Sequence, residues 1–99
     1  MTFQKFFPYK DNKMFAEDIA LSDIAEKVGT PFYCYSNTAI SHNFQDYKQA
    51  FADQDTLICY AVKANGNQAV LSTLAKLGSG ADVVSMGEIL RARAAGIEA

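Results

Sequence analysis

The strongest constraint on the fold is a regular alternation of short apolar segments with longer amphipathic ones. Apolar, β-rich segments begin near residues 32, 57 and 81, so they recur about every 25 residues, and a stretch with helical periodicity separates each pair. This spacing is typical of βα units, which form parallel sheets because a crossover helix returns the chain to the same edge. The sequence therefore predicts an α/β fold, either a barrel or an open doubly wound sheet.

Capping and turn residues define the limits of the expected elements. Each expected helix follows a polar residue that can accept hydrogen bonds from its first turn, and three of them end near a glycine. The predicted helices start after Ser22, Ser36, Asn67 and Ser85 and run to about residues 28, 52, 77 and 95; the predicted strands cover residues 32–35, 56–62 and 81–84; and a hairpin turning at Asp11-Asn12 is expected within residues 1–20.

The type of parallel sheet follows from what the sequence lacks. A Rossmann sheet would carry Gly-x-Gly-x-x-Gly after its first strand, whereas Gly78-Ser79-Gly80 follows a helix and precedes a strand. A barrel of eight βα units needs about 250 residues, and the 99 residues here supply two or three units. We therefore expect the start of a parallel (β/α)8 TIM-type barrel, in the N-terminal part of a larger enzyme.

Lys63 follows the apolar segment 56–62, at the end of a strand expected to be buried on both faces. Catalytic groups of α/β proteins project from strand C-termini, and apolar walls around a lysine favour its free, nucleophilic amine. Position alone favours a solvated lysine at the edge of a sheet, since lysines are rarely buried.

Three ordered segments carry a family resemblance. Tyr-Ala-Val-Lys-Ala-Asn at residues 60–65 resembles the cofactor-lysine motif of the fold-type III, alanine-racemase-like pyridoxal phosphate enzymes, and residues 80–89 resemble their second motif. Residues 21–36 are similar to the corresponding segment of the diaminopimelate decarboxylase family. The resemblance implies pyridoxal 5'-phosphate as cofactor and decarboxylation of meso-2,6-diaminopimelate to L-lysine, the last step of lysine biosynthesis.

The same resemblance assigns roles to four residues. It implies that Lys63 and Asp82 are catalytic, that both also bind the cofactor, and that Ala61 and Glu88 contact the cofactor. Asp82 could instead be a charge near a helix N-terminus, and a capping box with Ser85 explains Glu88 fully without a role at the cofactor. The two arginines of the last helix, at positions 91 and 93, are interpreted as solvated charges.

The resemblance also implies a larger assembly. Residues 1–30 would associate with a separate β-domain, residues 31–99 would form the first units of the cofactor-binding barrel, and the full-length enzyme would be a homodimer. The isolated 99 residues are expected to be inactive. Alternatives are a decarboxylase for ornithine, arginine or carboxynorspermidine, a racemase of the same superfamily, a non-catalytic homologue that binds pyridoxal phosphate, and a small α/β binding domain without cofactor.

Charge and cysteine content exclude several other classes. A net charge of −2 provides no basic surface for nucleic acid or anionic membranes, and no apolar run approaches the ~18 residues of a membrane span. Cys34 and Cys59 lie in predicted buried strands without metal-ligand spacing, and His42 lies off the apolar stripe of its helix, so no metal site is expected. These features favour a reducing cytoplasm as the location. The N-terminal aromatic residues could form ordinary core or dock on another surface.

Overall fold

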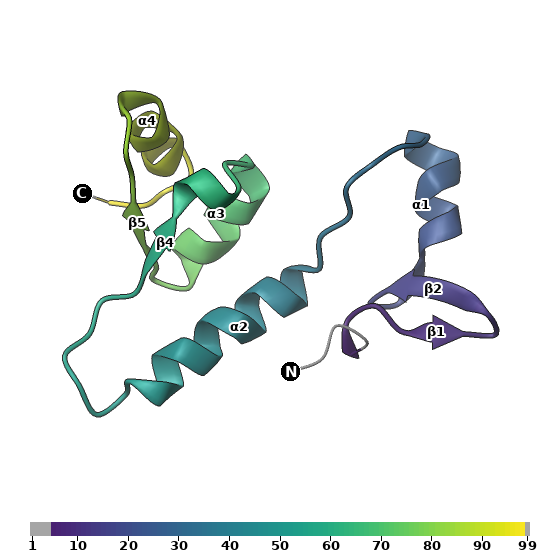
Figure 1. Cartoon of the computed structure of the whole chain (residues 1–99), viewed down its shortest axis with the longest axis horizontal. Helices are drawn as coiled ribbons and strands as arrows, with labels where there is room; N and C mark the ends of the chain where they lie inside the picture. Colours follow the sequence, from purple (N-terminus) through teal and green to yellow (C-terminus); the bar gives the residue numbers. More distant parts are fainter. Residues whose placement is uncertain (1–4, 99) are drawn as a thin grey trace. The chain divides into compact units, whose positions relative to one another are not determined.

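The computed structural model describes residues 5–98 and divides the chain into two compact units, residues 1–39 and residues 40–99 (Figure 1). Each unit has its own secondary structure and is described separately. The expected boundary near residue 30 concerns the domains of a longer enzyme and stays a prediction.

The first unit contains a small antiparallel sheet with the order β1-β2-β3. Its strands are β1 (Tyr9–Lys10), β2 (Lys13–Ala16) and β3 (Ile19–Ala20). Asp11 and Asn12 connect β1 to β2 with positive φ angles of 51° and 62°, as a tight two-residue hairpin turn requires. The predicted hairpin is therefore confirmed, and a third strand extends it.

The N-terminal aromatic residues divide between core and surface. Phe6 is 5% exposed and belongs to the interior of the first unit, whereas Tyr9 is 68% exposed. The backbone carbonyl of Phe6 also accepts the N–H of Glu17 at 2.8 Å, which ties the segment before β1 to the turn after β2. Phe3 lies outside the described residues.

Helix α1 (Leu21–Val28) follows β3 directly and has no side-chain cap. The predicted cap at Ser22 is wrong because Ala20 is still extended and occupies the cap position, so Ser22 is already the second helical residue. The predicted end is confirmed. Gly29 takes a φ of 79° and donates its N–H to the carbonyl of Ala25, which is the usual role of glycine after a helix.

Residues 32–35 do not form the predicted strand. No strand of the part described, residues 5–98, pairs with this segment, and Tyr33 is 90% exposed. The rings of Tyr33 and Tyr35 instead stack on each other, with centroids 6.5 Å apart. Aromatic and apolar residues favour extended backbone, but a strand also needs a hydrogen-bonded neighbour, and this segment has none here.

Helix α2 (Asn37–Ala50) begins where predicted and ends two residues earlier than expected. The Ser36 hydroxyl accepts the backbone N–H of Ala39 at 3.0 Å, which confirms the predicted cap. Of the apolar stripe on this helix, Phe44 is buried, whereas Tyr47 and Phe51 are exposed. Only the first half of the stripe is covered by other parts of the second unit.

The second unit alternates strands and helices. Its elements after α2 are β4 (Cys59–Ala61), the 3-10 helix η2 (Val62–Ala64), α3 (Gln68–Lys76), β5 (Gly80–Asp82) and α4 (Met86–Ala94). Strands β4 and β5 pair in parallel, with Cys59 opposite Gly80 and Ala61 opposite Asp82 (Figure 1). The predicted βα order and parallel pairing are confirmed, although both strands are shorter than expected and the barrel is not closed in this chain.

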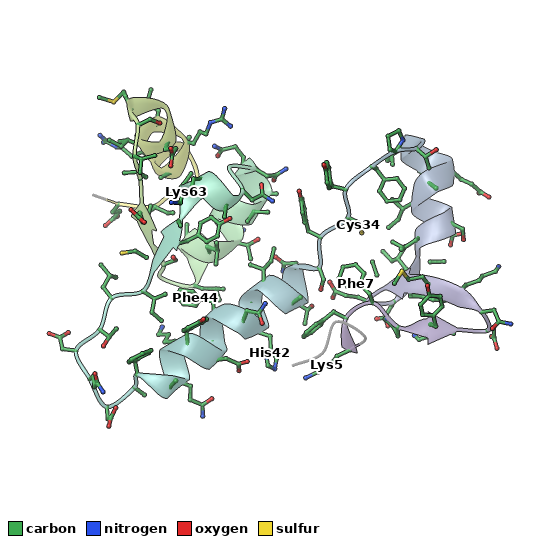
Figure 2. All side chains as sticks on the ribbon, viewed as in Figure 1. Lys5, Phe7, Cys34, His42, Phe44 and Lys63 are labelled. Atoms are coloured by element: carbon green, nitrogen blue, oxygen red, sulfur yellow. The ribbon has the colours of Figure 1, made fainter. Side chains whose placement is uncertain are left out.

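Helices cover one face of the β4–β5 pair. The core consists of Phe44, Val70 and Leu74, and four partly buried residues pack against it: Ile40, Ile58, Tyr60 and Leu77. Figure 2 shows Phe44 on α2. Because side chains alternate across a strand, Tyr60 faces this core and its neighbours Cys59 and Ala61 face the other way.

The opposite face of the β4–β5 pair is open. Leu57 is 72% exposed, and Cys59 is exposed as well. The prediction that segment 56–62 is buried on both faces is therefore wrong for the residues described. The two cysteines are not the buried core residues expected, since Cys34 is half-buried in an unpaired segment, and both thiols are free.

The core of the second unit predicts a clear difference between two leucines. Leu71 is 0% exposed, so Leu71→Ala should leave a cavity and lower the free energy of unfolding by about 2–5 kcal/mol. Leu57→Ala removes the same atoms from the open face and should change it by less than about 0.5 kcal/mol. Urea unfolding followed by circular dichroism measures both. Equal losses would show that the packing described is wrong.

Candidate active site

Lys63 lies in the middle of η2, immediately beyond β4 (Figure 2). Strand β4 ends at Ala61, so the lysine lies one tight turn past the strand rather than at its last position. Val62, just before it, is 2% exposed and anchors the turn in the core. The side chain of Lys63 itself is exposed, so the expected apolar walls are absent from the described residues.

Asp82 is brought to the same edge of the sheet as Lys63. It is the last residue of β5 and pairs with Ala61, the last residue of β4. Paired residues of neighbouring strands place their side chains on the same face, so Asp82 and Ala61 share the open face. Within residues 5–98, Lys63 and Asp82 form no ion pair with each other.

Glu88 lies in the first turn of α4, which packs against η2. The Ser85 hydroxyl accepts the backbone N–H of Glu88 at 3.1 Å, which confirms Ser85 as the helix cap. The same hydroxyl lies 3.3 Å from Oε2 of Glu88 and donates to it. Oε1 of Glu88 is buried and has no hydrogen-bond partner among the described residues, so this carboxylate retains an unused acceptor.

The backbone after Lys63 is held by its neighbours in sequence. The Tyr60 hydroxyl donates to the carbonyl of Asn65 at 3.1 Å, and the Asn65 N–H donates to the carbonyl of Val62 at 3.1 Å. Oδ1 of Asn65 accepts the N–H of Asn67 at 3.0 Å, which forms a local turn. These bonds surround Lys63 without using its amine.

Asn67 joins this turn to α3. Its Oδ1 accepts the N–H groups of Ala69 at 2.9 Å and Val70 at 3.4 Å, so the predicted cap is confirmed. The turn after the lysine and the start of the next helix therefore form one continuous hydrogen-bonded segment.

Arg91 on α4 also contacts this segment, which the sequence did not reveal. A Cβ built on Gly66 would lie 3.6 Å from both Cδ and Nη1 of Arg91, so the arginine stem packs over the turn. Nε2 of Gln68 donates to the carbonyl of Arg91 at 3.1 Å. Arg91 was interpreted as a solvated charge. It is exposed but also packs on the turn, and its hydrogen bond with Gln68 spans 23 positions, so neither contact has a local sequence signal.

Other polar groups lie outside this edge. Nδ1 of the half-exposed His42 is 3.1 Å from Oδ2 of Asp46, one helical turn away on α2. The part of the chain that the structure describes contains no group of three or more metal-ligating side chains. Over the same residues, no helix has the length and apolar character needed to span a membrane.

A carboxylate in the first unit has a perturbed pKa. The hydroxyls of Thr38 and Ser36 both donate to Glu17, and these bonds hold the pKa of Glu17 below its ordinary value of 4.5. The Thr38 hydroxyl has the larger effect. Because Ser36 also caps α2, the carboxylate is linked through one hydroxyl to the start of that helix.

Comparison with known proteins identifies similar sequences and folds. Residues 37–99 match the family described as "Pyridoxal-dependent decarboxylase, pyridoxal binding domain". The chain is 51% identical over 90 residues to a diaminopimelate decarboxylase of Pseudomonas aeruginosa, a match that covers 91% of this chain and 22% of that protein. It is 47% identical over 94 residues to that of Haemophilus influenzae, a match that covers 95% of this chain and 23% of that protein.

Solved structures agree with these sequence matches. The structure of AQ1208 from Aquifex aeolicus matches with a TM-score of 0.89 and 45% identity, covering 94% of this chain and 23% of that one. A diaminopimelate decarboxylase from M. jannaschii, in complex with L-lysine, matches with a TM-score of 0.90 and 38% identity, covering 98% of this chain and 24% of that one. The chain thus spans less than a quarter of the length of these relatives.

The cap at Asn67 predicts a stability difference that depends on one side-chain oxygen. Asn67→Ala removes the acceptor for two N–H groups of α3 and should lower the free energy of unfolding by about 1 kcal/mol. Asn67→Asp keeps an oxygen at the same position and should lower the free energy of unfolding by much less. Urea titration compares the two variants, and equal stabilities would contradict the capping role.

The hydroxyls around Glu17 predict a dependence on pH. Since its pKa is lower in the folded than in the unfolded protein, the ionised carboxylate stabilises the fold at neutral pH, and this stabilisation is lost as pH falls below about 4.5. Glu17→Gln should therefore be less stable than the wild type near pH 7, and the difference should shrink as pH falls below 4.5. Denaturant unfolding at several pH values tests this, with exposed Asp18→Asn as the control. A difference that stays constant across pH would refute it.

Proposed function

Because this chain belongs to the pyridoxal-dependent decarboxylase family, through the pyridoxal-binding domain of that family, we propose that the intact protein decarboxylates meso-2,6-diaminopimelate to L-lysine. This would be the last step of lysine biosynthesis. The observation that carries the proposal is the position of Lys63 directly beyond the C-terminal edge of two parallel strands, the edge at which Asp82 ends β5, and next to a helix that carries an unpartnered carboxylate oxygen.

The residues at this edge are suited to pyridoxal phosphate. The exposed Lys63 amine, which has no ion pair within residues 5–98, would bind the aldehyde of the cofactor. Ala61 ends β4 with a side chain of one carbon, which would leave room for a flat ring against the open face. Oε1 of Glu88 is a buried acceptor that still lacks a donor, as expected where a further group completes the site.

When bound, pyridoxal phosphate accepts the electron pair left behind by the departing carboxylate of an amino acid. The chain's own residues would hold and orient the reactants. Lys63 would tether the cofactor and release it to the amine of the substrate. Asp82, across from Ala61, would provide a negative charge that controls the charge state or orientation of the lysine. Glu88 would contact the cofactor from α4.

The open face of the sheet supports the proposal of a TIM-type barrel. Leu57 and Cys59 lie on the face that no helix covers, which would become the interior of the barrel once further strands close it. Helices α3 and α4 would then belong to the outer ring. In the intact enzyme, residues 1–30 would associate with a separate β-domain and two copies would form a homodimer. Two free thiols suit a reducing cytoplasm.

Related substrates define the second candidate function. A decarboxylase for ornithine, arginine or carboxynorspermidine would use the same lysine and differ in residues that bind the distal end of the substrate. The identities of 47–51% with diaminopimelate decarboxylases favour diaminopimelate. A homologue that binds the cofactor without catalysis would retain the tether and release no CO2.

The decisive experiment is to locate the cofactor and measure turnover. The intact protein, incubated with pyridoxal phosphate and reduced with borohydride, should carry one pyridoxyl group on the peptide that contains Lys63. It should also release CO2 from meso-diaminopimelate in preference to ornithine or arginine. Lys63→Ala should abolish labelling at this peptide and reduce CO2 release to the uncatalysed background.

Lys76→Ala is the matched control, because Lys76 is also an exposed lysine of the second unit but lies at the far end of α3. It should leave labelling and turnover unchanged. Labelling spread over many lysines in the wild type would refute the proposed tether. Labelling at Lys63 without CO2 release from any amino acid would refute the decarboxylase activity and show that the protein binds the cofactor without catalysis.

A further inference from the structure

We propose that Tyr60 is a positioning residue for Lys63, holding the lysine's backbone in place through a hydrogen bond that spans it in the sequence. The inference rests on the proposed function, since it concerns the lysine that would bind the cofactor. Tyr60 lies three residues before Lys63 and bonds to a residue two positions after it.

The ring of Tyr60 is fixed by packing. It lies in β4 and packs against the core formed by Phe44, Val70 and Leu74. As a strand residue adjacent to Ala61, it projects to the helix-covered face and away from the open face. The ring is therefore set in the rigid part of the second unit and cannot itself contact a cofactor on the open face.

The Tyr60 hydroxyl connects this packed ring to the turn that follows Lys63 in the sequence. It donates to the carbonyl of Asn65 at 3.1 Å, and Asn65 returns its N–H to the carbonyl of Val62 at 3.1 Å. Val62 is 2% exposed, so the residue before Lys63 is held by burial and the turn after it by the tyrosine. The backbone of Lys63 is fixed on both sides while its side chain stays exposed.

The position of the backbone matters because the Lys63 amine would have to reach one atom, the aldehyde carbon of the cofactor. A fixed backbone limits the positions that the amine can reach, and reaction rates depend steeply on such placement. Without the hydroxyl, the Asn65 carbonyl loses its hydrogen bond to the core-packed tyrosine, and the amine samples a wider volume. The hydroxyl would thus affect cofactor capture without touching the cofactor.

Tyr60→Phe tests the inference in the intact protein, because it removes the hydroxyl and keeps the ring in the core. Two quantities are measured: hydrogen exchange of the Asn65 amide, and the rate at which pyridoxal phosphate is attached to Lys63, trapped by borohydride at successive times. Losing one hydrogen bond should speed exchange and slow attachment by roughly three- to tenfold each. Tyr47→Phe, at an exposed tyrosine of α2, should change neither rate.

The outcomes separate this inference from the proposed function. Wild-type protein that attaches no cofactor at Lys63 would overturn the proposed function, whatever the variants do. If the wild type does attach it, an unchanged attachment rate in Tyr60→Phe would overturn the positioning role, even if exchange at Asn65 is faster. Unchanged exchange would overturn the structural premise. Faster exchange with slower attachment, and normal rates in Tyr47→Phe, would establish the role.

Discussion

The parallel pairing of β4 with β5 is the interaction on which the rest of the second unit depends. Its register places Ala61 opposite Asp82, so the two strands end together, and the lysine and the aspartate reach one edge. A shift of the register by one residue would move Asp82 to the helix-covered face, where a carboxylate would be buried without a partner. The register is therefore enforced by the same alternation that builds the core.

Side-chain caps at the N-termini of α3 and α4 fix the turns that connect the strands to the helices. Asn67 and Ser85 each accept N–H groups of the first turn, and each cap follows closely after a strand end. Because the caps fix where α3 and α4 begin, the connecting turns have little freedom. Arg91 and Gln68 then join the two helices across the turn after the lysine. The edge of the sheet is thus held by short polar contacts and its other parts by apolar packing.

Much of this could be read from the sequence, since caps and glycine stops are local signals. The order of strands and helices after α2, the caps at Ser36 and Asn67, and the hairpin at Asp11-Asn12 depend on residues within a few positions of one another, and the structure agrees with them. The candidate site was also visible, because its residues lie in short recognisable motifs. The roles assigned to those residues stay predictions.

What the sequence did not reveal depends on distant partners. Ser22 has the chemistry of a cap, but β3 runs straight into the helix and places Ala20 at the cap position. Residues 32–35 have the composition of a strand and no neighbour to pair with among those described. The packing of Arg91 on Gly66 requires α4 to lie over the turn, which no local pattern encodes. In each case a tertiary contact, present or missing, overrides the local preference.

The lysine illustrates a division of labour between backbone and side chain. An amine on a loose loop would reach its target rarely, because reaction rates depend steeply on how the reacting groups are placed. Here the buried Val62 and the Tyr60 hydrogen bond hold the backbone around Lys63, and the lysine side chain stays exposed. The apolar walls expected from sequence are missing from this part of the chain. Any desolvation of the amine would therefore come from groups that close over the open face, including the cofactor ring itself.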